Sequence, residues 1–548
     1  MKGYWKEYVC SLRYLKTSKR NIMKDIADVL VIGSGAAGGA LTWKLAERGV
    51  KVVCLEQGGW IDSGTFPSAK PDYETQLIRG DFNFNPNIRQ RPEDYPVLTA
   101  GEFPPNIMMF NAVGGSTIHW QGHFPRFHPS DFRVKALDGV ADDWPISYKD
   151  LEPYYDLNDT MIGVSGLNGD PSNPPRSARQ TPPLPIGKMG NALAKGFEKL
   201  GWYWWVSDQA IVSESYKTKP GCMLHGKCMF GCPIGAKAST DRTYWPLSIE
   251  KGAILKTFCR VKEITVNKKG DADGALYFDK DNNLVEIKAK VVVVCCNGVG
   301  TPRLLLNSKS ALFPDGLANS NGVVGKNFMV HPVIFGSGIF EEELDSHLGA
   351  MGNPLMSQEF YETDSKRGFV RGYSLIAERT FGPLSQSFGL PWGKEHHRSF
   401  KKVFSHQAGL TAIIEDLPEE GNRVELSNEK TDSNGIAAAK VTYSLSENSK
   451  KQLEHARQKI TEGLEAAGAT SISTPTSNGG HLMGTARMGK DPKRSVVNAN
   501  NQSHEVKNLF IVDGSSFTTA AGVNPTSTIM ALALRAADKI WEMRTEWS

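Results

Sequence analysis

The stretch ADVLVIGSGAAGGALTWKLAERGVKVVCLE (residues 27–56) decides the fold of this chain. Its apolar start (27–32) predicts a buried strand, which is followed by a glycine-rich turn. A helix is then expected from Gly39 to Arg48, and a second strand over 50–56. A strand, a helix and a strand at this spacing form the βαβ unit that opens many α/β folds.

The glycines of this unit predict a dinucleotide site. Gly33 makes the tight turn, Gly35 lets a pyrophosphate approach the backbone, and Gly38 allows close packing of helix on strand. Glu56 ends the second strand, 18 residues after Gly38, where a carboxylate accepts hydrogen bonds from a ribose. This acidic residue argues against NADP, but it does not separate FAD from NAD. The residues predicted to bind the cofactor in this unit are Gly33, Gly35, Ala36, Ala37, Gly38 and Glu56.

Two later segments favour FAD. NAVGGSTIHW (111–120) is a second glycine turn that carries polar and aromatic side chains, and NPT (524–526) opens a helix near the C-terminus. A second helix N-terminus aimed at the cofactor suits an isoalloxazine ring, whose pyrimidine side gains negative charge on reduction. The further cofactor-binding residues that we predict are Gly114, Gly115, Ser116, His119, Trp120, Asp513, Gly514, Asn524, Pro525 and Thr526.

Bulk composition excludes several classes of protein. A chain of 548 residues exceeds the size of one hydrophobic core, so two or more folded units are expected. The formal net charge of +4 is small and not gathered into basic arms, which excludes nucleic-acid binding. No apolar run is long enough to span a membrane, and the basic N-terminus lacks the apolar core of a secretory signal. Residues 1–22 are expected to be a disordered extension or an upstream start, although they could instead form a short helix.

The elements predict a discontinuous organisation in a mixed α/β (α+β) fold. Nucleotide-binding elements occur at the start, middle and end of the chain, including an apolar strand of the parallel-sheet kind at 289–296. Between them, 335–475 alternates apolar and polar residues and predicts an antiparallel sheet facing a pocket. We therefore expect a Rossmann-like FAD-binding domain with a discontinuous substrate domain. The expected order is 1–22 N-terminal extension, 23–130 first segment of the FAD-binding domain, 131–239 substrate domain with a cysteine insertion, 240–330 second segment of the FAD-binding domain, 331–475 substrate domain, and 476–548 third segment of the FAD-binding domain.

These motifs, in this order, resemble the glucose–methanol–choline (GMC) oxidoreductase family. Within that family the chain looks most like the bacterial catalytic subunits that oxidise sugars and sugar acids, such as the glucose, gluconate, sorbitol and glucoside 3-dehydrogenase types. The resemblance covers nearly the whole chain from about residue 27. Besides the first glycine turn, it rests on VGGSTIHW (113–120), DWPISYKDLEPYY (143–155), NGVGTPRLLLNS (297–308), VGKNFMVHP (324–332), HLMGTARMG (481–489) and VDGSSFTTAAGVNPTSTIMALA (512–533).

The resemblance implies a catalytic pair at the flavin, with His481 as base and Asn524 as its partner. The chemistry suits these residue types, since a histidine titrates near neutrality and an asparagine can stabilise a developing alkoxide. By pattern alone, His481 could instead be a buried structural residue. Some members of the family attach FAD covalently through a histidine in the second glycine turn, but we favour non-covalent contact or packing for His119. We interpret His331 as structural.

The segment CMLHGKCMFGCP (222–233) sets three cysteines at spacings of six and four, the last followed by proline. This resembles ferredoxin ligand runs, and related sugar dehydrogenases carry a three-iron cluster on a matching triplet. We predict a [3Fe-4S] cluster on Cys222, Cys228 and Cys232. There are two alternatives. One is a zinc site formed by the three cysteines and His225, and the other is a disulfide that leaves one free thiol.

The resulting hypothesis is an FAD-dependent dehydrogenase that oxidises a CH–OH group of a sugar or glycoside and passes electrons through the cluster to a cytochrome c acceptor. Alternatives are an oxygen-reducing oxidase of the same family without a cluster, and a flavin-binding subunit without turnover. The resemblance also implies a small chaperone-like partner subunit. It favours a periplasmic or membrane-associated location through that partner over a cytoplasmic one. No motif in 335–475 identifies the sugar or the hydroxyl group.

Overall fold

The predicted strand, turn, helix and strand are present in the computed structural model, which describes residues 26–79 and 94–547. The strand β1 (Ala27–Ile32) leads into the helix α2 (Ala36–Glu47), and β2 (Val52–Leu55) follows. The helix begins three residues before the expected Gly39, because the N–H of Gly39 already bonds the carbonyl oxygen of Gly35. The prediction for residues 1–22 lies outside the described residues.

The first sheet places the nucleotide-binding elements side by side although they come from three regions of the chain. Its strand order is β5-β2-β1-β8-β7-β6, and β17 also pairs with β8. β1 is parallel to β2 and β8, and β17 is parallel to β8. The remaining strands of this sheet are β5 (Ile254–Lys256), β6 (Arg260–Val266), β7 (Ala272–Phe278), β8 (Leu284–Val294) and β17 (Leu509–Ile511).

The strand expected at 289–296 is β8, and only half of its length pairs in parallel. Residues Ala289–Val294 pair in parallel with β1, whereas the preceding half pairs antiparallel with β7. The antiparallel half alternates exposed and half-buried residues, so it lies at the margin of the sheet. The strand ends at Val294, which leaves Cys295 and Cys296 in the turn beyond its carboxyl end.

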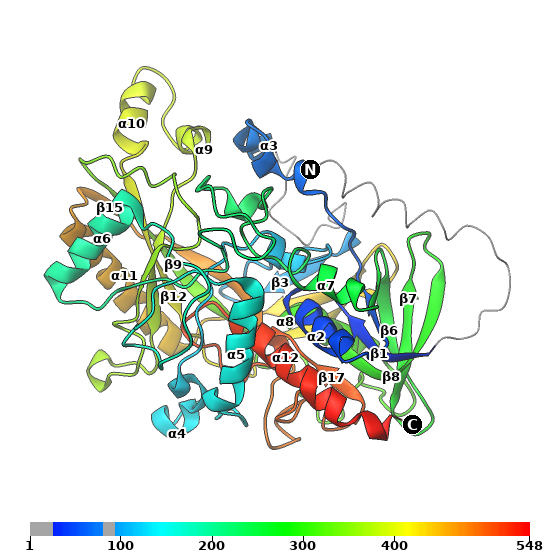
Figure 1. Cartoon of the computed structure of the whole chain (residues 1–548). Coiled ribbons are helices and arrows are strands. Elements are labelled where there is room, and N and C mark those ends of the chain that lie inside the picture. The colour runs from blue at the N-terminus through cyan, green and yellow to red at the C-terminus, as the bar shows by residue number, and fades with distance from the viewer. Residues whose placement is uncertain (1–25, 80–93, 548) are drawn as a thin grey trace.

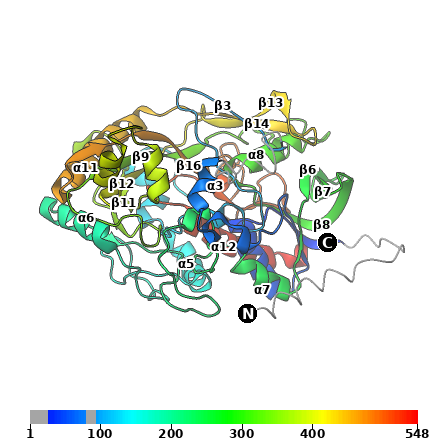
Figure 2. The same ribbon diagram turned by 90° about the horizontal axis from the view of Figure 1, so that it is seen from above.

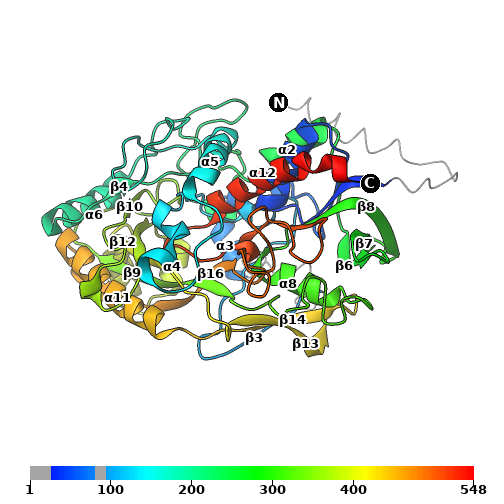
Figure 3. The ribbon, with the colours of Figure 1, turned by 90° about the horizontal axis from the view of Figure 1, so that it is seen from below.

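One face of this sheet is covered by helices from opposite ends of the sequence. α12 (Thr526–Glu542) packs against α2 and against α5 (Tyr148–Ile162), and α7 (Tyr244–Glu250) packs against the other side of α2. Figures 1 and 3 show α12, in red, lying beside α2, in blue. The interface is almost wholly apolar, with Leu41, Leu45, Met530 and Leu534 fully buried. α5 has fifteen residues and begins within the motif DWPISYKDLEPYY (143–155).

The second sheet is the antiparallel sheet predicted for 335–475. Its order is β15-β9-β12-β11-β10-β4, with β16 also pairing with β9. The amphipathic helices α6 (Gly187–Leu200) and α11 (Glu447–Ala467) cover its outer face, on the left in Figure 1. The strands are β4 (Trp205–Val206), β9 (Met329–Ile339), β10 (Leu355–Ser357), β11 (Tyr373–Glu378), β12 (Gln407–Ile414), β15 (Ser471–Ser473) and β16 (Thr476–Met483).

Two strands expected in that sheet form a separate one, which corrects the prediction. β13 (Arg423–Thr431) and β14 (Ala437–Thr442) make a hairpin, and β3 (Val97–Ala100) pairs with β14 in parallel. This three-stranded sheet packs on α8 (Asn297–Asn307), as Figures 2 and 3 show. The alternating pattern predicted strands correctly, but it carried no information about which sheet they join.

The helix α8 begins at the first residue of the motif NGVGTPRLLLNS (297–308). The side chain of Asn297 accepts hydrogen bonds from the N–H groups of Val299 and Gly300 and so caps the first turn, which leaves Pro302 inside the helix. No helix within the described ranges is long and apolar enough to cross a membrane. The other α-helices are α3 (Tyr73–Arg79), α4 (Val134–Asp138), α9 (Pro383–Phe388) and α10 (His396–Val403).

Candidate active site

A cavity of about 520 Å³ lies beyond the carboxyl ends of β1 and β8 and reaches the inner face of the second sheet. Crevices at the carboxyl ends of parallel strands are where α/β folds bind their ligands, and this volume falls in the usual range for cofactor and substrate sites. The predicted residues that line it are Gly33, Gly35, Ala36, Ala37, Glu56, Gly115, Ser116, His119, Trp120, His481, Asp513, Gly514, Asn524, Pro525 and Thr526.

The first glycine turn fits a bound pyrophosphate. A Cβ on Gly33 would stand 2.4 Å from the carbonyl oxygen of Cys295, and one on Gly38 would stand 1.9 Å from that of Gly33. A Cβ on Gly35 would meet no atom within 4 Å, because this residue faces the cavity. Gly35 also caps α2 without any side-chain hydrogen bond, so the first N–H groups of the helix are available to an anion.

Glu56 is buried at the end of β2, as a ribose-binding carboxylate should be. It accepts hydrogen bonds from the N–H of Ser34 (2.9 Å), the hydroxyl of Ser34 (2.7 Å) and the N–H of Gly58 (2.8 Å). Burial raises the pKa of Glu56, and these donors offset some of that rise. They also fix the carboxylate in the cavity wall.

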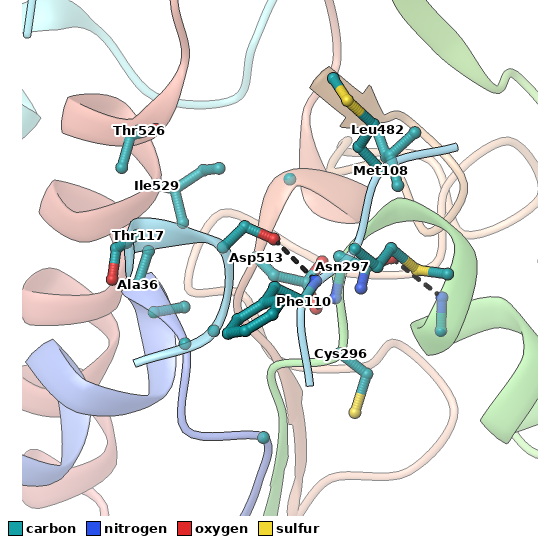
Figure 4. Close-up of a pocket in the computed structure, with 18 of the residues that line it drawn as sticks. Ala36, Met108, Phe110, Thr117, Cys296, Asn297, Leu482, Asp513, Thr526 and Ile529 are labelled. Atoms are coloured by element: carbon teal, nitrogen blue, oxygen red, sulfur yellow. Dashed lines mark hydrogen bonds between the residues drawn. The ribbon is translucent and has the colours of Figure 1, made fainter. Parts of the chain in front are cut away.

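The C-terminal segments complete the wall of the cavity. Asp513 accepts hydrogen bonds from the N–H of Asn297 (3.1 Å) and the hydroxyl of Thr301 (2.6 Å), which ties the turn after β17 to the start of α8 (Figure 4). α12 begins at the cavity, and Pro525 at its N-cap provides no side-chain cap. Gly38 and Gly114 do not line the cavity. The missing side chain of Gly38 lets α2 approach the backbone of Gly33, and that of Gly114 lets the second glycine turn approach Asp241.

His481 and Asn524, the predicted catalytic pair, face each other across the cavity end. His481 lies on β16, where the register with β9 is irregular on both sides of Gly480, and its backbone is left-handed (φ 67°). A non-glycine residue in this conformation is strained and is typical of a functional position. Its Nε2 lies 3.4 Å from Nδ2 of Asn524.

The neighbours of His481 determine which ring nitrogen carries its proton. Nε2 of His331 lies 2.7 Å from the carbonyl oxygen of Ala521, which can only accept, so this nitrogen bears hydrogen. Nδ1 of a neutral His331 is then an acceptor, and it lies 2.8 Å from Nδ1 of His481. His481 therefore donates through Nδ1, and its Nε2 presents a bare lone pair to Asn524 and the cavity.

Both imidazoles are neutral at physiological pH in this setting. Burial, reinforced by the neighbouring histidines, lowers the pKa of His481 to about 3, and burial lowers that of His331 to about 4. The interpretation of His331 as structural is therefore incomplete, since it also sets the protonation of its neighbour.

His123 is a further site residue that sequence reasoning missed. Its Nδ1 donates to Oδ1 of Asn524 at 2.7 Å, which leaves the amide nitrogen of Asn524 directed toward His481. Burial lowers the pKa of His123 to about 4. The only signal in the sequence is the alternation of His119, Gln121 and His123, which line one wall of the cavity.

The cysteine segment lies directly behind this wall. Each thiol sulfur receives a backbone N–H at 3.4 Å: Cys222 from Leu224, Cys228 from Met351 and Cys232 from Lys237. The three cysteines belong to one buried cluster and carry no disulfide, and burial raises the pKa of Cys222 to about 11 and that of Cys228. Met229, which follows Cys228, lines the cavity and accepts a hydrogen bond at its carbonyl oxygen from Nδ1 of His119 (3.0 Å).

Two buried cations border the thiols. Lys237 donates to the carbonyl oxygens of Ile118, Trp120 and Cys228, each at 2.7 Å. Arg379 donates to backbone carbonyls, including that of Ala350 at 2.7 Å. Within residues 26–79 and 94–547, neither cation forms a salt bridge to a carboxylate. Burial lowers the pKa of Lys237 to about 8, and Asp241 opposes this shift without a direct ion pair.

No three histidine, cysteine, aspartate or glutamate side chains of the described chain are arranged to hold a single metal ion. A zinc ion would draw its ligand sulfurs to within about 4 Å of one another. This geometry does not support the zinc alternative with His225, and the free thiols do not support a disulfide.

Comparison with known proteins decides the family. Two models described as GMC oxidoreductase match residues 106–333 and 418–533, and one of a NAD(P)-binding Rossmann-like domain matches 31–91. The chain is 44% identical over 532 residues to 2-methyl-1,2-propanediol dehydrogenase of Mycolicibacterium austroafricanum, covering 94% of this chain and 95% of that protein. The chain belongs to the GMC oxidoreductase family.

Other GMC relatives include the fructose dehydrogenase large subunit of Gluconobacter japonicus, 31% identical over 94% of this chain and 97% of that one. Among solved structures, pyridoxine 4-oxidase from Mesorbium loti superimposes with a TM-score of 0.63 over 94% of this chain and 99% of that chain. Its identity is 17%, so this likeness concerns the fold alone. It agrees with the mixed α/β, Rossmann-like architecture.

Membership in the GMC family, together with the Rossmann-like unit, implies FAD, and the glycine turn and Glu56 fit it. The chain is accordingly an oxidoreductase that acts on CH–OH groups. Non-covalent contact of His119 with FAD stays a prediction. Its Nδ1 faces Met229, its ring packs edge-on against Phe110 at 4.2 Å, and burial lowers its pKa to about 4.

Proposed function

We propose that this GMC protein is a dehydrogenase that oxidises a CH–OH group of a small polyhydroxy compound, with FAD as the first acceptor. A [3Fe-4S] cluster on Cys222, Cys228 and Cys232 would then pass electrons to a cytochrome-type protein. The observation that carries the oxidation is the bare Nε2 of His481 at the cavity, fixed by His331 and paired with Asn524.

The residues divide the chemistry of alcohol oxidation between them. When bound, FAD supplies the acceptor for the hydride that leaves the carbinol carbon. His481 accepts the hydroxyl proton at Nε2, and the Nδ2 group of Asn524 donates to the oxygen as negative charge develops on it. The neutral state of His481 matters because a protonated imidazole could not take this proton.

The test of the catalytic assignment is His481→Ala. We expect the rate of flavin reduction by substrate to fall by about 10²–10⁴-fold while FAD remains bound. His406→Ala is the matched control, because His406 directly precedes β12 of the same sheet and does not line the cavity. If substrate reduced the flavin of His481→Ala at the wild-type rate, the assignment of His481 as catalytic base would be wrong. Such a result would favour a flavin-binding subunit without turnover.

The cluster is supported by the setting of the three thiols. Three backbone N–H donors and two buried cations that form no salt bridge with the described carboxylates favour an anionic occupant, and a cluster bound by thiolates is one. Thiols bridged through several irons and sulfides are also held farther apart than those around one ion. Iron and acid-labile sulfide should therefore be found with FAD in the purified protein.

Cys232→Ser should lose that iron, whereas Cys54→Ala, in a core strand, should keep it. A cluster-free protein that consumes oxygen at the rate of substrate oxidation would overturn the cluster proposal. It would favour the oxidase alternative, which the similarity to paromamine 6'-oxidase of Streptomyces fradiae also makes worth testing.

The substrate can be a sugar, as the fructose dehydrogenase relative suggests, or a small diol, as the 44% identical relative suggests. A panel of sugars, glycosides and diols with an artificial electron acceptor separates them. The wall that faces the flavin site includes Val333, Ile376 and Ile413, and this apolar strip favours a compact substrate with a hydrocarbon side.

The acceptor protein is proposed to dock over the cysteine segment. Met223 is 63% exposed and Leu348 is 55% exposed on the two strands of chain that meet at the His225–Gly349 bridge. A small partner subunit and a periplasmic or membrane-associated location belong to the same proposal. Purification of the native protein with its bound subunits, followed by cell fractionation, tests both.

A further inference from the structure

The inner face of the second sheet presents one carboxyl group among apolar side chains. Pairing of Ile376 with Thr411, and of Glu378 with Gly409, places these residues on one face, because paired residues point the same way. Thr411 in turn pairs with Phe335, and Ile413 with Val333. Glu378, Ile376, Thr411, Ile413, Val333 and Phe335 all line the cavity.

Glu378 is half-buried at the end of β11 and held in place without a counter-charge. One carboxyl oxygen accepts a hydrogen bond from Nε2 of Gln121 (2.6 Å) and the other from Nδ2 of Asn353 (3.0 Å). No lysine, arginine or histidine of the described chain forms a salt bridge with it. Two donors leave lone pairs unused on both oxygens. A carboxyl that is partly desolvated and has no counter-charge is unfavourable for folding, which points to a role in the cavity.

The strand opposite leaves this carboxyl free of one further contact. Gly409 stands opposite Glu378, and a Cβ on Gly409 would come within 2.8 Å of Cβ of Glu378, so position 409 places no side chain beside it. The two side chains that contact the carboxyl are Gln121 and Asn353. Thr411, the next residue on this face of β12, is 1% exposed, and its hydroxyl oxygen has no hydrogen-bond partner. The polar atoms of Glu378 and Thr411 therefore lie together beside the apolar strip.

The same segment links Glu378 to the catalytic pair. Gln121 binds Glu378, and His123, two residues later, binds Asn524. A substrate whose reacting hydroxyl lies at His481 and Asn524 thus has a second polar position along the same wall. The apolar strip of Ile376, Ile413 and Val333 can face its carbon atoms.

We propose that Glu378 accepts a hydrogen bond from a second, non-reacting hydroxyl group of the substrate, and so selects small diols over simple alcohols of the same length. This inference rests on the proposed function, because it assumes that an alcohol carbon is oxidised at His481. Gln121 and Asn353 orient the carboxyl and are positioning residues.

The experiment compares 1,2-propanediol, 1,3-propanediol and 1-propanol as reductants of the purified holoenzyme with an artificial acceptor. The assay is run at pH 8, because burial raises the pKa of Glu378 to about 7. For the wild type we expect kcat/KM to be about 10–100-fold higher for the better diol than for 1-propanol, which is the effect of a hydrogen bond to a charged group. Glu378→Leu removes the acceptor and should bring that ratio close to 1. Glu378→Gln keeps an acceptor oxygen of the same size and should give an intermediate ratio.

Glu425→Gln, on the exposed strand β13, is the matched control and should leave the ratio at the wild-type value. Each variant is first checked for its FAD content, and if Glu378→Leu fails to hold FAD, the ratio in Glu378→Gln decides. A ratio unchanged in the Glu378 variants, or an equal loss for diols and 1-propanol, would overturn the proposal in favour of a purely structural carboxyl. If the wild-type protein oxidises none of the alcohols or sugars tested, it is the proposed function that fails.

Discussion

Nδ1 of His331 lies 2.8 Å from Nδ1 of His481, and the carbonyl oxygen of Ala521 fixes the proton of His331 on the opposite nitrogen. His331 therefore sets the protonation of the catalytic base, His481, although His331 does not itself line the cavity. Loss of this contact should change both the protonation of His481 and the rate of substrate oxidation.

Replacement of His331 by phenylalanine should lower kcat by at least about 100-fold, because His481 loses the acceptor that holds its Nδ1 proton. The pH dependence of kcat should change at the same time, since His481 then titrates without this neighbour. His331→Asn supplies an acceptor oxygen and should restore some of the rate. An equal loss in both variants, with an unchanged pH profile, would indicate a merely structural residue.

Lys237→Met should lower the midpoint potential of the proposed cluster. Reduction adds negative charge beside Cys228 and Cys232, and the variant lacks the buried cation that stabilises it. A potentiometric titration measures the shift. Lys219→Met is the control, because Lys219 is also largely buried and binds only the carbonyl oxygen of Ile162. An unchanged potential in a Lys237→Met protein that retains its iron would contradict the electrostatic role.

Substitution of two glycines in the first turn should separate cofactor binding from folding. Gly35→Val places a side chain in the cavity, so the protein should fold but bind FAD at least about 100-fold more weakly. Gly38→Ala should instead destabilise the fold, because its Cβ meets the carbonyl oxygen of Gly33. FAD content and the melting temperature of the apoprotein distinguish the two effects. A Gly35→Val protein with a full complement of FAD would show that the pyrophosphate lies elsewhere.

Asp416 should make stability fall as pH rises. It is buried against the hydroxyl groups of Tyr443 and Ser449, and burial raises its pKa from 3.8 to about 7. The carboxyl therefore binds its proton more tightly in the folded state than in the unfolded state. The stability that this proton contributes is complete below about pH 4 and is lost as the pH rises to about 7. The full effect is about 4 kcal/mol at 1.36 kcal/mol for each pKa unit.

Asp416→Asn carries no charge to bury, so its melting temperature relative to wild type should rise from pH 5 to pH 8. A constant difference between the two proteins over this range would show that the carboxyl does not titrate in the folded state.

Local sequence patterns were sufficient for the elements that depend on near neighbours. The unit from β1 to β2 follows from periodicity and glycine spacing within 30 residues. His481 and Asn524 are 43 residues apart, and their pairing was predicted only through the family resemblance.

Contacts across long separations in sequence escaped prediction. His331 and His481 are 150 residues apart, Gln121 and Glu378 are 257, and Ile118 and Lys237 are 119. Each contact joins residues of ordinary types, and it becomes distinctive only when the fold brings the two segments together. The same reason explains why the hairpin of β13 and β14 was assigned to the wrong sheet.

The packing of α12 on α2 has a consequence for biosynthesis. The helix that supplies the first phosphate-binding turn is complete after 47 residues, but the helix that covers it starts at Thr526. A ribosome must therefore release almost the entire chain before the apolar face of α2 is covered and the cofactor cavity closes. Cofactor capture is thus a late event, and a nascent or C-terminally truncated chain would expose this face to chaperones and to aggregation.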